Sequence, residues 1–205
     1  MMWVKGAWAG GLVILFLVFS AWYGGNGKPL SLEEGREMLA HLQEVHGADP
    51  TEEGGLLANL QAMLPNDDGK EFYAVNLETL KDGEAAREAD RAYAAIVMPL
   101  LFKRASHPVF VSERAGLMLG KYGEEIDRVA VVRYRSLRDL ISMASEPSMV
   151  EGSPYKFAAL EHTEVFITRP SITFMHIRFV VALILLIIGA LGWVMIARFA
   201  RKRLA

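Results

Sequence analysis

Four polar side chains are the candidates for chemistry in this chain: Asn76, Tyr93, His107 and Arg133. Asn76 and Arg133 each lie near the end of an apolar stretch that alternates like a strand, so both can point into one barrel. An amide and a guanidinium placed there would hold an enolate or carboxylate oxygen by charge-assisted hydrogen bonds. In the alternative, Asn76 ends its strand and Arg133 pairs with a carboxylate at a dimer edge. The pattern favours the alternative.

Tyr93 and His107 also allow two interpretations each. Tyr93 falls on the apolar face of a helix expected over residues 84–103. Its hydroxyl either faces a cavity or lies at the rim of the core, and the second is commoner. His107 precedes Pro108 at a strand entrance, where a polar residue can line the mouth of a cavity. The sequence does not decide whether these residues make the protein an enzyme.

Several kinds of site are not expected. The chain has no cysteine, which excludes disulfides, thiolate nucleophiles and Cys-ligated clusters. Its five histidines form no HxxxH or HxH pair, so no metal site is predicted. There is no P-loop, no GxGxxG and no nucleic-acid-binding pattern. We therefore expect no cofactor, no metal and no nucleic-acid partner.

Charged residues form two local groups whose roles the sequence leaves open. Arg133, Arg135 and Arg138 cluster in an otherwise acidic segment and form either an anion site or ion pairs, and pairing with Glu161, Glu164 or Asp139 is favoured. The acidic run of Glu84, Glu88 and Asp90 is expected on a solvated helix face.

Two apolar runs, residues 6–23 and 179–197, are long enough to cross the hydrocarbon core of a bilayer. Both have aromatic residues near their ends, as an interfacial belt requires. The first run lacks a small-x-small cleavage site, which favours an uncleaved anchor over a signal peptide. Small residues at Gly6-x-x-x-Gly10, and at Gly189, Ala190 and Gly192, predict close packing of the spans, within one chain or between protomers.

The charge distribution predicts the orientation of these spans. The two ends of the chain hold five of its 22 basic residues and none of its 24 acidic ones, so the segment between them carries 17 basic and 24 acidic residues and a net charge of −7. The positive-inside rule then places both termini in the cytoplasm and the central domain outside it. In a bacterium this is an inner-membrane protein with a periplasmic domain.

The resulting organisation has seven parts. We expect a cytoplasmic N-terminus (1–5), a transmembrane helix (6–23), a linker with two amphipathic helices (24–64), a ferredoxin-like periplasmic domain (65–170), a juxtamembrane segment (171–178), a second transmembrane helix (179–197) and a basic cytoplasmic tail (198–205).

Local signals place the elements of these parts. Ser31 and Ser136 have the chemistry of helix N-caps, and Asp139 stands three residues after the second of them. Pro99 is expected to kink or split its helix, and Pro147 to end the helix that Ser136 opens. Helices are expected over 31–45, 51–64, 84–103 and 136–145, with a helical turn over 153–160, and strands over 71–77, 108–111 continuing towards 119, 127–135 and 163–168.

This order is β-α-β-β-α-β, the ferredoxin-like α+β arrangement. An antiparallel sheet with both helices on one face leaves its other face uncovered. Phe72, Ala74, Val129 and Val131 are the candidates for that apolar face. Pairing with a second copy would bury it, so a homodimer is expected.

Two segments resemble a known family. Residues 64–77 (Leu64-Pro65-Asn-Asp-Asp-Gly69, then Phe72-Tyr-Ala-Val-Asn76-Leu77) are similar to the opening of an uncharacterised bacterial family in the dimeric α+β barrel superfamily, which also holds NIPSNAP-like, EthD-like and antibiotic-biosynthesis monooxygenase domains. His107-Pro-Val-Phe110 and the stretch from Asp127 to Pro147 resemble its second half. The resemblance covers about residues 60–168 and neither apolar run. It implies a dimer with a cavity between sheet and helices, and no known reaction.

The leading hypothesis is therefore a membrane-anchored, dimeric ligand-binding or assembly module. One alternative is a cofactor-independent enzyme of the monooxygenase or isomerase kind, acting on a small hydrophobic or carboxylated molecule. Another is an accessory subunit that contacts other membrane-protein subunits. The expected partners are the lipid bilayer and a second copy of the chain.

Overall fold

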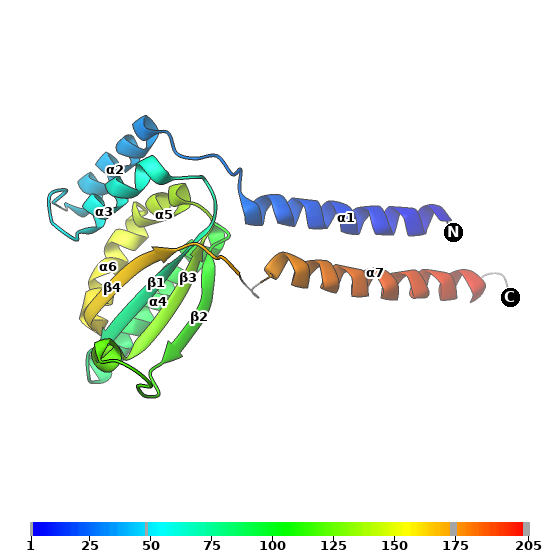
Figure 1. The fold of residues 1–205 in the computed structure, drawn as a ribbon. Coiled ribbons are helices and arrows are strands. Elements are labelled where there is room, and N and C mark those ends of the chain that lie inside the picture. Colours follow the sequence, from blue (N-terminus) through cyan, green and yellow to red (C-terminus); the bar gives the residue numbers. More distant parts are fainter. Residues whose placement is uncertain (1, 48, 173–175, 203–205) are drawn as a thin grey trace. The chain divides into compact units, whose positions relative to one another are not determined.

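The computed structural model describes residues 2–47, 49–172 and 176–202, without the side chains of residues 200–202. Part of the expected juxtamembrane segment and the end of the expected basic tail lie outside the described residues. The chain divides into two compact units. One holds the two terminal helices, and the other is the central unit, Gly24–Ser171 (Figure 1).

The terminal unit consists of helices α1 (Met2–Gly24) and α7 (Ile177–Lys202), both long and apolar enough to cross a membrane. They run antiparallel, because contacts pair the start of each with the end of the other. The Lys5 ammonium lies 4.3 Å from the centre of a Trp193 ring, and the Arg178 guanidinium lies 5.7 Å from the centre of the Tyr23 ring. Cations over aromatic rings at both ends suit the interfacial regions of a bilayer.

The glycines of the two helices differ in whether they contact the other helix. A Cβ added at Gly192 would lie 2.5–2.8 Å from atoms of the Trp8 ring, so this glycine permits the helices to approach. Beside this contact lies an apolar groove of about 470 Å³, lined by both helices. Gly6 and Gly10 have no described atom within 4 Å of such a Cβ. The Gly6-x-x-x-Gly10 motif therefore does not pack against α7.

The central unit has the expected α+β ferredoxin-like fold, with a four-stranded antiparallel sheet in the order β2-β3-β1-β4 (Figure 1). Helices α4, α5 and α6 cover one face of this sheet, and α2 and α3 pack beside α5. The elements are α2 (Leu32–His46), α3 (Leu56–Met63), a 3₁₀ turn η1 (Leu64–Asn66), β1 (Phe72–Leu80), α4 (Glu84–Lys103), β2 (His107–Glu113), a 3₁₀ turn η2 (Tyr122–Glu125), β3 (Arg128–Tyr134), α5 (Leu137–Ala144), α6 (Pro147–Ala159) and β4 (Leu160–Thr168).

Both predicted helix caps are confirmed. The Ser31 hydroxyl accepts a hydrogen bond from the Glu34 N–H at 3.1 Å, at the start of α2. The Ser136 hydroxyl accepts from the Asp139 N–H at 3.2 Å and donates to the Asp139 carboxylate at 2.8 Å, at the start of α5. Each cap satisfies an N–H that has no partner inside its helix.

Several predicted boundaries are wrong. Strand β1 continues to Leu80 rather than ending at residue 77, and β4 begins at Leu160 rather than at residue 163. Helix α3 begins at Leu56 rather than near Thr51, because Thr51 is held in a turn by hydrogen bonds to the Asp49 carboxylate. Strand β2 ends at Glu113, its last partner on β3, instead of continuing towards residue 119. The helix that Ser136 opens ends at Ala144, ahead of Pro147 as predicted. The helical turn expected over 153–160 is instead the helix α6, which already begins at Pro147, where the missing N–H of the proline costs nothing. Helix α4 also runs through Pro99 without being split.

The faces of the sheet correct another expectation. Phe72 stacks on Tyr134 at 5.5 Å and belongs to the core cluster under α5, so Phe72 and Ala74 point towards the helices. Val129 and Val131 pair with the β1 residues that alternate with Phe72 and Ala74, so these two valines lie on the uncovered face, as predicted. Alternation alone had placed all four residues together, because it does not fix which strand positions face each other.

The buried core is divided. A larger cluster lies under α2, α3 and α5 and includes Phe72, Leu137 and Ile141. A much smaller one, at the other end of the sheet, joins Ala89 of α4 and Ala159 of α6 to Leu160 and Leu80. The segment between the two clusters is the region where polar side chains enter the layer between sheet and helices.

Candidate functional site: a polar layer between the sheet and helices α4 and α6

Helices α4 and α6 pack antiparallel, and their register fixes which residues share a level. Ala89 lies beside Ala159 in the small cluster, and a Cβ at Gly152 would lie 3.0 Å from the Ile96 side chain. Because the two helices run in opposite directions, a residue a given number of positions after Ala89 lies beside the residue the same number of positions before Ala159. This register places Lys156 level with Ala92, so Lys156 and Tyr93 lie within one residue of the same level, about 1.5 Å apart along the helix axes.

An ion-pair network joins the sheet to α4 at the same level. The Arg128 Nε donates to the Glu78 carboxylate at 2.6 Å, and its two terminal nitrogens donate to both oxygens of Asp90 at 2.8 Å. Glu78 is only 6% exposed. The hydrogen bond from Arg128 holds the pKa of Asp90 below its usual value. Asp90 was expected on a solvated face, and this contact corrects that expectation.

Tyr93 of α4 faces this network. Burial raises the pKa of Tyr93 to about 12, and the nearby Glu78 carboxylate adds to the shift. Its phenol therefore stays protonated at neutral pH and can donate a hydrogen bond. Within the described residues its hydroxyl has no hydrogen-bond partner.

Lys156 of α6 lies near the same charges. It is half-buried, and it forms no side-chain hydrogen bond or ion pair with any described residue. Burial lowers the pKa of Lys156, an effect that Glu78 opposes and Arg128 reinforces. A lysine without a described carboxylate in contact, and near a Glu78 carboxylate that Arg128 already engages, has its donors available for another group.

The sheet adds two polar groups to this layer. Thr163 of β4 lies opposite Glu78 in the sheet and on the same face, and its hydroxyl is buried without a hydrogen-bond partner in the described part of the chain. Asn76 of β1 lies two residues from Glu78, and its amide nitrogen donates to the carbonyls of Ala74 and Ala130 at 3.3 and 3.0 Å. Those two bonds leave the Asn76 amide oxygen free to accept.

The middle of the layer is not sealed by apolar side chains. Asn76, Ala130 and Val132 lie on the helix-facing side of the two central strands, yet all three are only half-buried. Residues at both ends of the same side, such as Phe72 and Glu78, are buried. Solvent therefore reaches the centre of a layer that in most two-layer domains is closed core.

The structure separates the four candidates predicted from the sequence. Asn76 and Tyr93 both face the polar layer. Arg133 lies on the other side of the sheet, because it is three residues from Ala130, the strand partner of Asn76. His107 pairs with Arg133 across the ladder and shares its side. Asn76 and Arg133 therefore do not point into one space, and the oxyanion pair that the sequence allowed does not form; Arg133 instead contacts a carboxylate, as in the favoured alternative.

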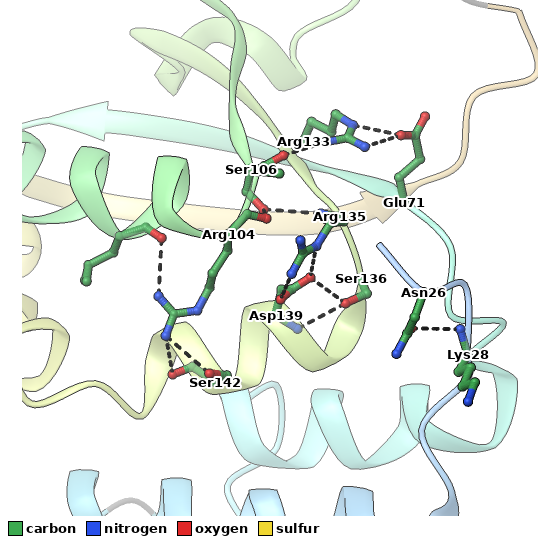
Figure 2. Close-up of polar contacts among 12 residues, drawn as sticks. Asn26, Lys28, Glu71, Arg104, Ser106, Arg133, Arg135, Ser136, Asp139 and Ser142 are labelled. Carbon is green, nitrogen blue, oxygen red and sulfur yellow. Dashed lines mark hydrogen bonds and ion pairs between the residues drawn. The ribbon is translucent and has the colours of Figure 1, made fainter. Parts of the chain in front are cut away.

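Arg133 is engaged by its own chain (Figure 2). Its Nε donates to the Glu71 carboxylate at 2.8 Å and its NH1 to the carbonyl of Ala105 at 2.6 Å. Ala105 has a left-handed backbone (φ 53°), which directs that carbonyl towards the guanidinium. The His107 ring contacts the carbonyl of Pro108 at 3.0 Å. Both residues hold the α4–β2 junction in place.

The other two arginines of the basic cluster are also paired with carboxylates. Arg135 contacts Asp139 in a two-pronged arrangement at 2.7 Å (Figure 2), and Arg138 contacts Glu34 of α2. Asp139 was among the expected partners, whereas Glu34 and Glu71 were not. The three arginines of the cluster therefore form ion pairs within the central unit rather than an open anion site.

Sequence reasoning missed four members of the layer: Glu78, Arg128, Lys156 and Thr163. The signal for Glu78 was present, because Ala74, Asn76 and Glu78 alternate on one strand face. The others come from elements far apart in the chain, and only the register of the sheet and of the helix pair brings them together.

The uncovered face of the sheet is a second candidate surface. Val75, Val129 and Val131 are half-buried there, and Phe110 and Phe166 are 56% and 44% exposed. The loop containing η2 touches only one end of this face, where Tyr122 donates to Glu164 and Thr79 donates to the carbonyl of Glu125.

Comparisons with known proteins extend this description. No protein-family model and no curated protein matches the sequence. The structure is similar to RPA0582, a protein of unknown function from Rhodopseudomonas palustris, with 24% identity and a TM-score of 0.52 over 61% of this chain and 97% of that one. The structure of methylated RPA0582 has 22% identity and a TM-score of 0.52, over 62% of this chain and 96% of that one. Likeness at this level of identity shows that the central part shares the α+β ferredoxin-like fold of RPA0582. A more distant structure is SnoaB, a cofactor-independent oxygenase from Streptomyces nogalater, with 13% identity and a TM-score of 0.37 over 52% of this chain and 98% of that one. Likeness at that level carries no weight for function.

Proposed function

We propose that this protein is a membrane-anchored, homodimeric binding module. Two copies pair through their uncovered sheet faces, and each protomer holds a small molecule in its polar layer. The observation that carries the proposal is the partial exposure of Asn76, Ala130 and Val132 under helices that would normally seal them. The hydroxyls of Tyr93 and Thr163, which have no hydrogen-bond partner in the described part of the chain, give such a molecule specific contacts.

A packing experiment tests the binding space without knowledge of the ligand. Ala130→Met places three further heavy atoms in the half-buried middle of the layer. If this space is kept for a ligand, the free energy of unfolding stays within about 0.5 kcal/mol of the wild type. If the layer is closed core, overpacking lowers it by about 1–3 kcal/mol. Ala89→Met, in the small buried cluster, is the matched control that should show the larger loss. Equal losses in the two variants would refute the proposed space.

The membrane anchor is the antiparallel pair of α1 and α7. Arg198 follows the apolar part of α7, and Lys5 stands near the start of α1, so both lie at the same end of the pair. The positive-inside rule supports a cytoplasmic position for both termini and a periplasmic one for the central domain. A reporter fused after residue 205 should be active only in the cytoplasm. The uncovered Gly6 and Gly10 face of α1 offers a place for the span of another membrane subunit.

The uncovered apolar face supports the homodimer, because such a face is unfavourable in contact with water. Val131→Glu should convert the detergent-solubilised dimer to a monomer, as measured by light scattering after gel filtration. Val111→Glu is the matched control, since Val111 is 57% exposed in the same sheet but on the other face. A wild-type protein that is monomeric, or a Val131→Glu variant that stays dimeric, would contradict pairing through this face.

A second candidate is a cofactor-independent enzyme acting on a small hydrophobic or carboxylated molecule. It is favoured by Tyr93, whose protonated phenol has no partner among the described residues and could donate a hydrogen bond to an oxyanion that develops during a reaction. In that case Tyr93→Phe would abolish turnover but preserve binding of the molecule. Loss of binding instead would assign Tyr93 to recognition alone.

A further inference from the structure

We infer that Lys156 is the anchor for an anionic group, and that the ligand of the polar layer is a small carboxylate. This inference rests on the proposed binding function of the layer and names the chemical class of the molecule. Three groups at one level can each donate a hydrogen bond to it: the Lys156 ammonium, the Tyr93 phenol and the Thr163 hydroxyl.

The first step is the position of Lys156. Gly152 lies against Ile96 on the side of α6 that packs on α4. Lys156 is four residues further along α6, and therefore one turn away on the same side. It does not extend into solvent from the opposite side of the helix. The charges that act on it are those of Glu78 and Arg128, which both belong to the helix-facing side of the sheet.

The second step is the balance of charge at this level. Arg128 contacts both carboxylates, Glu78 at 2.6 Å and Asp90 at 2.8 Å. Two acidic and two basic side chains are therefore present, but neither acidic group lies within 4.0 Å of the Lys156 nitrogen. An ammonium that is partly removed from water and makes no direct ion pair is unfavourable for folding. A bound carboxylate would supply the missing contact.

The third step is the donor set around it. Tyr93 faces Glu78 from α4, and Thr163 lies opposite Glu78 from β4. The hydroxyl of Thr163 is fully buried and unpartnered among the described residues, a state that native proteins rarely leave without a water or ligand. Two hydroxyl donors and an ammonium match the two oxygens of a carboxylate. The half-buried Ala130 and Val132 offer apolar contact to the remainder of the molecule.

Two matched probes test this inference: octanoate and its neutral analogue octanamide, added to the full-length protein in mild detergent. Calorimetric titration measures both dissociation constants. The wild type should bind octanoate at least tenfold more tightly than octanamide. Lys156→Met should lose this preference, and Lys121→Met, at an exposed loop lysine, should keep it. Lys156→Met removes an unpaired cation, so its melting temperature should equal or exceed that of the wild type, which excludes misfolding as the cause.

The outcomes separate the inference from the proposed function. Equal affinity for the two probes in the wild type, or an unchanged preference in Lys156→Met, overturns the role of Lys156 but leaves a binding layer. Failure of both probes to bind, together with a large loss of stability in Ala130→Met, overturns the binding function and the inference with it. Loss of preference in both lysine variants would assign the effect to overall charge and would also overturn the role of Lys156.

Discussion

Removal of Arg128 should reveal how strongly the polar layer depends on one side chain. In Arg128→Met the apolar stem is retained, but three hydrogen bonds to Glu78 and Asp90 are lost. The Glu78 side chain is 8% exposed, so its carboxylate would remain buried with no cation in contact. Breaking a buried pair by removing one partner destabilises a protein by about 3–5 kcal/mol.

The expected loss lies at the lower end of that range. The side chain of Asp90 is 34% exposed and that of Arg128 is 20% exposed, so water screens part of the network. We therefore expect the free energy of unfolding to fall by about 3 kcal/mol. For a chain of this size that corresponds to a decrease in melting temperature of about 6–12 °C.

Thermal unfolding of the full chain in detergent, followed by circular dichroism, measures this change. Arg87→Met is the matched control: Arg87 pairs with Glu84 on the same helix, but the two side chains are 62% and 60% exposed. That variant should melt at the temperature of the wild type, because water screens an ion pair this exposed. Adding Glu78→Gln to Arg128→Met should restore part of the stability, because the uncompensated charge is removed. Equal losses in Arg128→Met and Arg87→Met would refute the reasoning.

Three further predictions concern the terminal helices, the cap of α5 and the titration of Asp90. Gly192→Leu should drive the Trp8 ring away and separate a cysteine pair engineered across α1 and α7, whereas Gly10→Leu should not; equal cross-linking would contradict the packing. Ser136→Ala should lower the free energy of unfolding by about 1 kcal/mol in urea titrations, and an unchanged midpoint would count against the cap. Arg128 lowers the pKa of Asp90 in the folded protein, so the ionised Asp90 carboxylate stabilises the fold. This contribution is present above the pKa of Asp90 in the unfolded chain, near 3.8, and is lost as pH falls through its pKa in the folded protein. Arg128→Met should lack that step in acid titrations, and its persistence would exclude Asp90 as the source.

The features that the sequence predicted correctly depend on neighbours in the chain. Ser136 and Asp139 are three residues apart, so the cap between them needs no tertiary contact. The order of strands and helices follows in the same way from local alternation and helical spacing. The boundary error at Thr51 also has a local cause. The Thr51 backbone N–H donates a hydrogen bond to the Asp49 carboxylate, and this bond stabilises a turn that competes with a helix.

The errors arose where a prediction depended on which residues of two neighbouring strands pair with each other. Phe72 and Val129 were assigned to one face, and the sequence left open whether Asn76 and Arg133 share one space. Alternation along a strand is exact, but a shift of one residue between strands moves every side chain to the other face. The observed register pairs Phe72 with Tyr134, and this pairing decides both cases.

The sequence by itself determined two apolar runs, a β-α-β-β-α-β order and the caps that start its helices, because periodicity, length and local hydrogen bonds are properties of contiguous residues. Only the tertiary structure decided that Arg133 binds the carbonyl of Ala105 at the α4–β2 junction and that Glu78, Arg128, Tyr93 and Lys156 meet in the polar layer. These four come from two strands and two helices. Their meeting depends on strand register and on the antiparallel packing of α4 against α6, which no contiguous stretch of sequence encodes.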